Sequence, residues 1–198
     1  MAERRVFLLS PANCGGERAQ LLFSPRATFD LARRLRTPGG APLGEVMSFV
    51  SGLYFRGKLT YAARFGVPLV ITPHAGLRPP DDPVTLARLR AAARVDIHPE
   101  NPRYRRPLLV SARAVASVLE PDDGVTLLGS IASDKYVSAL LEVFGTRLTF
   151  PKVFVGRGDM SRGGLLLRSV RYEVELDYVP VAGAVRHGPR PPRLERAR

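Results

Sequence analysis

Residues Val67–Thr72 read Val-Pro-Leu-Val-Ile-Thr, and residues 73–82 continue as Pro-His-Ala-Gly-Leu-Arg-Pro-Pro-Asp-Asp. The first stretch predicts a buried strand, because strands that are covered on both faces carry continuous apolar residues. The prolines and the glycine that follow predict a loop that continues neither a strand nor a helix. The chain therefore contains a strand whose carboxyl end opens into a loop of polar and charged residues.

Three other apolar runs predict strands at residues 6–9, 125–128 and 148–155. Pro151 lies inside the last run and cannot donate a ladder hydrogen bond, so it predicts an edge position for that strand. A terminal hairpin is expected over residues 171–181.

Apolar residues at helical spacing separate these strands. Ser24-Pro25 predicts the start of a helix that ends by Thr37, and Gly52 and Gly57 predict that residues 45–65 form two shorter helices. The remaining expected elements are helices at 82–93, 108–119 and 130–144, a proline-rich loop at 96–106 and a glycine-rich turn at 156–164.

This alternation of strands and helices predicts an α/β fold with a mostly parallel sheet flanked by helices. The 198 residues are 45% apolar, which is enough for one sizeable core. We expect a single domain at residues 1–182 and a disordered tail, rich in arginine and proline, at 183–198.

The net charge of +12 is the strongest signal in the composition, and the only lysines are Lys58, Lys135 and Lys152. Such a field attracts polyanions, and guanidinium groups suit both phosphate contacts and stacking on bases. The charge predicts nucleic acid as the partner. The alternative is that the arginine content reflects codon bias and thermal adaptation and that the charges are merely solvated.

Metal and redox chemistry find little support in the sequence. Cys14 is the only cysteine, which rules out an internal disulfide and a thiolate zinc site and suggests a passive thiol. His74, His98 and His187 show no paired spacing, so we expect no metal and no cofactor. The apolar runs are too short for a membrane span or a signal peptide, and we expect a cytoplasmic protein.

Small and polar residues gather in four loops that follow predicted strands, at 10–16, 73–82, 129–136 and 156–168. Because the carboxyl ends of parallel strands meet at one edge of a sheet, these loops can share one cleft for an anionic or nucleobase ligand. The alternative for each loop alone is an ordinary turn. The candidate nucleic-acid-binding residues are Ser10, Asn13, Tyr54, Lys58, Arg78, Ser130, Ser133, Lys135, Tyr136, Arg157, Arg162 and Arg168.

The candidate catalytic residues are Asp81, His74 and Asp82, all in the second loop. His74 is a candidate acid or base, and a carboxylate beside Arg78 is a candidate for orienting water. The alternatives are that the two aspartates cap a helix and that the histidine bonds to backbone. Tyrosines of the binding set either stack on a base or belong to the core.

Four motifs in the same order resemble those of the YaaA family of peroxide-stress DNA-binding proteins. They are Leu8-Leu9-Ser10-Pro11-Ala12, Ala75-Gly76-Leu77-Arg78-Pro79-Pro80-Asp81, Ala132-Ser133-Asp134-Lys135-Tyr136, and Ser161-Arg162-Gly163-Gly164-Leu165-Leu166-Leu167-Arg168. Gly52-Leu53-Tyr54-Phe55-Arg56-Gly57 resembles a fifth. The chain departs from the family pattern at Asn13-Cys14 and at Ala75, and no helix-hairpin-helix can be located.

The resemblance implies a YaaA-like fold and DNA binding in a stress or damage response. We therefore expect a nucleic-acid-binding protein whose cleft accepts a nucleotide or a flipped base, with a DNA base N-glycosidase as the sharper version. One rival is an enzyme for small nucleotides or nucleosides with a phosphate site at a helix N-terminus, although the Walker spacing is absent. Another is a basic interaction protein without a ligand site. Oligomeric state, turnover and the base or lesion are left open by the sequence.

Overall fold

The apolar strands lie side by side at the centre of one sheet in a computed structural model that describes residues 4–192. The four inner strands run parallel, and a short antiparallel strand closes each edge. The spatial order is β4 (Gly76–Arg78), β3 (Val67–Thr72), β1 (Arg5–Leu9), β6 (Gly124–Leu128), β7 (Leu148–Pro151) and β8 (Tyr178–Pro180). The predicted α/β class and mostly parallel sheet are confirmed.

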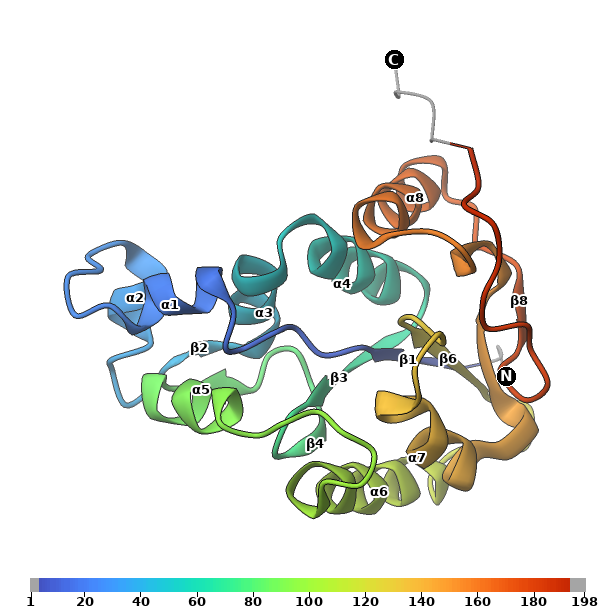
Figure 1. The fold of residues 1–198 in the computed structure, drawn as a ribbon, viewed down its shortest axis with the longest axis horizontal. Helices are drawn as coiled ribbons and strands as arrows, with labels where there is room; N and C mark the ends of the chain where they lie inside the picture. Colours follow the sequence, from blue (N-terminus) through green and yellow to red (C-terminus); the bar gives the residue numbers. More distant parts are fainter. Residues whose placement is uncertain (1–3, 193–198) are drawn as a thin grey trace.

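Helices cover both faces of this sheet (Figure 1). On one face α4 (Leu53–Phe65) packs against α8 (Asp159–Tyr172), and on the other α6 (Pro102–Ala116) packs against α7 (Asp134–Phe144). At the end of the molecule away from β8 lie α1 (Glu17–Phe23), α2 (Asp30–Arg34), α3 (Leu43–Ser51), α5 (Leu86–Ala93) and a two-stranded ribbon of β2 (Ala41–Pro42) and β5 (Pro83–Val84).

The core is centred on β1, which has strands on both sides and helices over both faces. Phe7, Leu8 and Leu9 have no exposed surface. Burial of such side chains supplies most of the favourable free energy of folding. The chain therefore leaves β1 after Leu9 at a fixed position.

Two glycines set the closest contact between helices. A Cβ atom at Gly57 of α4 would lie 2.7 Å from the carbonyl oxygen of Gly163 in α8, and one at Gly163 would lie 2.9 Å from the carbonyl oxygen of Leu53. No side chain fits there, so the two backbones approach directly. These glycines were predicted to weaken a helix and to form a turn, respectively. Their role is packing, which only the facing helix reveals.

Several predicted boundaries in the first half are wrong. Ser24 ends α1 instead of starting a helix. Of the helix predicted between Ser24 and Thr37, only Asp30–Arg34 is helical. The break at Gly52 is confirmed, since its φ of 64° ends α3 and starts α4. The stretch after Thr72 does form a strand, because the turn at Gly76 (φ 68°) folds β4 back onto β3.

Two predicted helix starts are displaced for local reasons. The helix expected from Asp82 begins at Leu86, because Pro83-Val84 pairs with Ala41-Pro42 and the Thr85 hydroxyl caps the helix by accepting from the Arg88 amide. The expected loop at 96–106 contains the start of α6, where the Asn101 side chain accepts a hydrogen bond from the Arg103 amide. Pro102 is tolerated there because the first turn needs no amide donor.

The C-terminal third differs most from expectation. β7 is not an edge strand, because β8 pairs with it and Pro151 is its last residue. Short 3-10 turns, η1 (Gly145–Arg147) and η2 (Lys152–Phe154), flank β7. The expected glycine-rich turn contains the first two turns of α8, and the expected hairpin is replaced by the end of α8 and β8 alone.

The described part of the basic tail contacts the body of the protein. Arg186 forms an ion pair with Asp134 at 2.5 Å, and Arg157 donates to the Pro192 carbonyl oxygen at 3.3 Å. Gly156 lies so close to Pro189 that a Cβ atom would meet its carbonyl oxygen at 2.2 Å. Residues 193–198 of the tail lie outside the described residues.

Candidate functional site

A cavity opens where the central strands end. The chain passes from β1 to β3 on one side and then to β6 on the other, so β1 and β6 flank the point where the strand order reverses. Ligands of open α/β sheets bind at such points. Ser10 directly follows β1, and Gly129 and Ser130 directly follow β6. The cavity measures about 730 Å³, and we call it the first cavity; the side chains on its wall that matter below are Ser10, Tyr54, Lys58, Ser130, Tyr136 and Asp159.

Lys58 is almost completely buried in this wall, with only 1% of its surface exposed. Its Nζ donates to the Ser10 carbonyl oxygen at 2.7 Å and lies 2.9 Å from Ser10 Oγ. The same nitrogen sits 4.5 Å from the ring centre of Tyr54 and 4.8 Å from that of Phe55. The helix α4 thus holds an amine against the end of the central strand.

Burial lowers the pKa of the Lys58 ammonium to about 7, because the charged form loses its hydration. The negative charge of Asp159 opposes this shift, and the positive charge of Arg162 adds to it. A substantial fraction of the amine is therefore neutral at physiological pH, unlike an ordinary solvated lysine.

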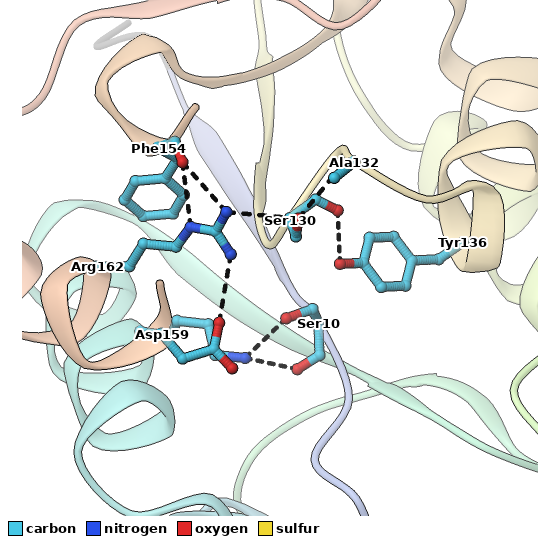
Figure 2. Close-up of polar contacts among 8 residues, drawn as sticks. Ser10, Ser130, Ala132, Tyr136, Phe154, Asp159 and Arg162 are labelled. Atoms are coloured by element: carbon cyan, nitrogen blue, oxygen red, sulfur yellow. Dashed lines mark hydrogen bonds and ion pairs between the residues drawn. The ribbon is translucent and has the colours of Figure 1, made fainter. Parts of the chain in front are cut away.

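Arg162 of α8 holds two groups of the cavity wall, Asp159 and Ser130 (Figure 2). Its Nε and Nη2 donate to the Phe154 carbonyl oxygen at 3.2 and 3.1 Å. Nη1 forms an ion pair with Asp159 at 3.3 Å, and Nη2 donates to Ser130 Oγ at 3.4 Å. Only 8% of the residue is exposed, so this planar donor set is fixed in place. It links α8 to the loop after β6.

Two buried tyrosines complete the wall. Tyr136 of α7 donates its hydroxyl hydrogen to the Ser130 carbonyl oxygen at 2.8 Å (Figure 2). Gly129 leaves the room for this contact, because a Cβ atom there would lie 2.8 Å from both the Tyr136 hydroxyl and Ser10 Cβ. Burial raises the pKa of Tyr136 to about 12 and also raises that of Tyr54. Both phenols are therefore neutral hydrogen-bonding groups at physiological pH.

The structure brings most of the predicted binding residues together. The ones that line the first cavity are Ser10, Asn13, Tyr54, Lys58, Ser130, Ser133, Lys135 and Tyr136. Arg162 reaches it through Ser130 and Asp159. Arg157 instead donates to the Val153 and Pro192 carbonyl oxygens, and Arg168 lies further along α8 and does not line the cavity.

The predicted catalytic residues lie elsewhere. His74 and Asp82 line a separate pocket of about 330 Å³ together with Arg78, Arg88 and apolar side chains, which we call the second pocket. Arg78 forms an ion pair with Asp82 there, and burial together with the nearby charge of Arg88 lowers the pKa of His74. Asp81 is exposed and lines neither space. Of the four loops expected in one cleft, the loop at 73–82 reaches the first cavity only through Pro73.

Two parts of the first cavity were missed in the sequence. Two carboxylates line it, Asp96 and Asp159, and residues 92–97 form one side of it. An acidic residue directly after Gly158 is typical of a helix start, since carboxylates are stabilised at helix N-termini. That signal was available, but the surrounding glycines suggested a turn.

Cys14 also lines the cavity but is not activated. The side chain is buried, and burial raises the pKa of its thiol to about 12. Within residues 4–192 no three histidine, cysteine or acidic side chains gather as a metal site would require. The helices in this same span are all too short or too polar to cross a membrane.

The chain matches no protein-family model, no curated protein and no solved structure among those with which it was compared. The resemblance to the YaaA family therefore stays a prediction.

Proposed function

We propose that this protein binds nucleic acid, DNA in the first instance, and that the first cavity receives one nucleotide or extruded base. The observation that carries the proposal is the set of buried polar groups around Ser10 and Ser130, at the point where the strand order reverses. Fixed hydrogen-bonding groups in such a cavity orient a bound ligand and give specificity.

The size and chemistry of the cavity suit a nucleotide. Its volume of about 730 Å³ is within the range of small-molecule sites. Tyr54 and Tyr136 are neutral and line the cavity, and a flipped base is held by stacking and by hydrogen bonds to its edge. The net charge of +12 draws a polyanion toward the protein.

The N-glycosidase version of the proposal assigns the carboxylate role to Asp159. Its side chain is 68% exposed at the cavity rim, and Arg162 holds it through the ion pair at 3.3 Å. A carboxylate so placed can stabilise the positive charge that develops on a sugar as its base leaves. Asp81, to which the sequence assigned this role, lies outside the first cavity.

The experiment is fluorescence-anisotropy titration of single-stranded, duplex and base-damaged oligonucleotides over a salt series, followed by alkali to reveal abasic sites. We expect binding with a steep negative salt dependence, because phosphate contacts release counterions. Strand breaks at one damaged base would support the glycosidase version. Absence of binding near physiological salt would contradict the proposal.

A matched lysine pair separates cavity binding from nonspecific attraction. Lys135 and Lys152 are both exposed, but only Lys135 lines the first cavity. We expect Lys135→Met to weaken binding by more than Lys152→Met. Equal effects, with binding lost on deletion of residues 186–198, would instead indicate a basic interaction protein. Binding of a nucleoside monophosphate without any binding of oligonucleotides would favour the small-molecule enzyme.

A further inference from the structure

Lys58 lines the first cavity, and its buried amine is held by the carbonyl and hydroxyl oxygens of Ser10 at the end of β1. We propose that Lys58 is a covalent nucleophile that forms an imine with the C1′ carbon of the bound sugar. This inference rests on the proposed function and adds to it a reaction, removal of a base or capture of an abasic sugar through an enzyme-linked intermediate.

The hydrogen-bond partners of Lys58 match the neutral amine. An ammonium group has three N–H donors, whereas a neutral amine has two and keeps a lone pair. The Ser10 carbonyl oxygen at 2.7 Å and Ser10 Oγ at 2.9 Å provide two acceptors. Among the described residues no carboxylate lies within 4.0 Å of the Lys58 nitrogen, so no direct ion pair holds the charged form.

The charges around this amine come from α8, and the neutral groups come from α4, α7 and Ser10 after β1. The rings of Tyr54 and Phe55 beside the nitrogen favour the ammonium form, as Asp159 does. Asp159 favours the ammonium form and Arg162 disfavours it, while desolvation is the largest influence and brings the pKa to about 7. Tyr54 and Tyr136 stay neutral because burial raises their pKa values. Desolvation beside a cationic group is a known way to make a lysine nucleophilic at neutral pH.

The proposed reaction balances without any oxidant or reductant. The Lys58 nitrogen bonds to C1′ as the C1′–base bond breaks, and one amine proton leaves with the base. The C1′–O4′ bond then opens, the second amine proton passes to O4′, and a C=N bond forms. Water hydrolyses this imine and returns the free amine and an aldehyde. Ser10 Oγ, 2.9 Å from the nitrogen, is placed to carry these protons.

An abasic sugar reaches the same imine without the step in which the base leaves. Its C1′ aldehyde accepts the amine, and the resulting carbinolamine loses water to give the same imine. This gives a direct test, because borohydride reduces an imine to a stable amine and locks the protein to the sugar.

The full chain is incubated with an oligonucleotide that carries one abasic site, sodium borohydride is added, and the product is resolved by denaturing electrophoresis. The modified peptide is then identified by mass spectrometry, which is simple because the chain has only three lysines. We expect the adduct on Lys58 in the wild-type protein. Its yield should fall at least tenfold in Lys58→Met and Lys58→Arg and stay within twofold in Lys152→Met.

No adduct, or an adduct confined to Lys135 or the N-terminal amine, would overturn the inference. Because the mapping is done on the wild-type chain, that conclusion holds even if a Lys58 variant fails to fold. Anisotropy on the same oligonucleotide distinguishes the two proposals: binding without an adduct contradicts the nucleophile and leaves the proposed function standing. An adduct of ribose 5-phosphate on Lys58 without oligonucleotide binding would support the nucleophile and contradict the nucleic-acid partner.

Discussion

The first cavity and the second pocket are neighbours that share Pro73 and Ala92 in their walls, yet they hold their polar residues differently. In the first, Lys58 and Arg162 are almost completely buried and bonded to two or more groups. In the second, the ion-pair partners keep 50% of the Arg78 side chain and 24% of the Asp82 side chain exposed.

The difference shows that a conspicuous cluster in a sequence is not yet a reactive site. The loop at 73–82 carries a histidine, an arginine and two aspartates within nine residues. Half of the Arg78 side chain is exposed, so its ion pair with Asp82 is partly screened, although Asp82 Oδ2 and His74 Nδ1 are themselves buried. Burial and fixed hydrogen-bond partners alter the reactivity of an ionisable group. Lys58 and Arg162 have both, through Ser10 after β1 and Ser130 after β6.

The largest effect should come from removing the amine of the first cavity. We expect Lys58→Met to lower base release or sugar trapping by on the order of 10²-fold or more, as loss of a principal catalytic group does. His74→Ala, in the second pocket, should change the same rate less than about twofold, since it contacts neither the amine nor its partners. Rates of abasic-site formation under single-turnover conditions measure both. The reverse ranking would place the chemistry in the second pocket.

The free energy of unfolding should fall more on substitution of Arg162, beside the first cavity, than on substitution of Arg78, in the second pocket. Arg162→Met leaves the buried Phe154 carbonyl oxygen without the two donors it has now, which costs about 1–3 kcal/mol of unfolding free energy. Arg78→Met removes a half-exposed ion pair and should cost less than about 1 kcal/mol. Urea denaturation followed by circular dichroism measures the two. Equal losses would mean that burial does not distinguish the sites.

The pH dependence of stability provides a third comparison, because burial lowers the pKa of both Lys58 and His74. Between pH 7 and 9 the unfolded chain holds a proton on Lys58 that the folded chain has largely released. Unfolding free energy should therefore rise with pH in this window, by at most about 1.4 kcal/mol per unit. From about pH 8 upward, ionisation of Cys14 in the unfolded chain opposes the rise, since its pKa is raised from the ordinary 9.0 to about 12 in the folded chain.

Lys58→Met should abolish the rise between pH 7 and 9, whereas His74→Ala should leave it intact. The folded pKa of His74 lies below 6.5, so its contribution also grows with pH but only below that value. The measurement is the urea midpoint of the wild-type protein, Lys58→Met and His74→Ala at each pH from 5 to 9. An unchanged slope in Lys58→Met would refute the assignment of a neutral amine.

A smaller effect than that of Arg162→Met should come from the contact between α4 and α8, the helices that carry Lys58 and Asp159. Gly163→Ala places a Cβ atom 2.9 Å from backbone atoms of Leu53 and Tyr54. Overpacking costs about 1–3 kcal/mol and alanine regains up to about 1 kcal/mol of helix propensity, so a net loss of about 1 kcal/mol is expected. Gly39→Ala, where a Cβ atom meets nothing within 4 Å, is the control for thermal denaturation. A gain in stability at Gly163 would show that α4 and α8 can separate without cost.

Much of the scaffold could be predicted from local sequence. The strands at 67–72 and 125–128 and the break at Gly52 were predictable because burial of a whole strand and a positive φ leave direct marks on residue type. The starts of α6 and α8 were not, since Pro102 and the glycines around Gly163 are equally typical of loops.

The residues of the first cavity were also mostly recognisable, as polar or small residues after strands. Their grouping was not, because Tyr54 and Lys58 lie on a helix that meets α8 more than 90 residues later in the chain. Asp159 joined the site for the same reason.

Composition, apolar runs and strand-end serines were enough to establish a basic α/β protein with polar groups at the carboxyl edge of its sheet, because each is a property of neighbouring residues. The neutral tendency of Lys58, the choice of Asp159 over Asp81 and the separation of the second pocket depend on desolvation and on the Gly57–Gly163 approach. Desolvation is set by what distant segments place around a group, so only the tertiary structure could decide them.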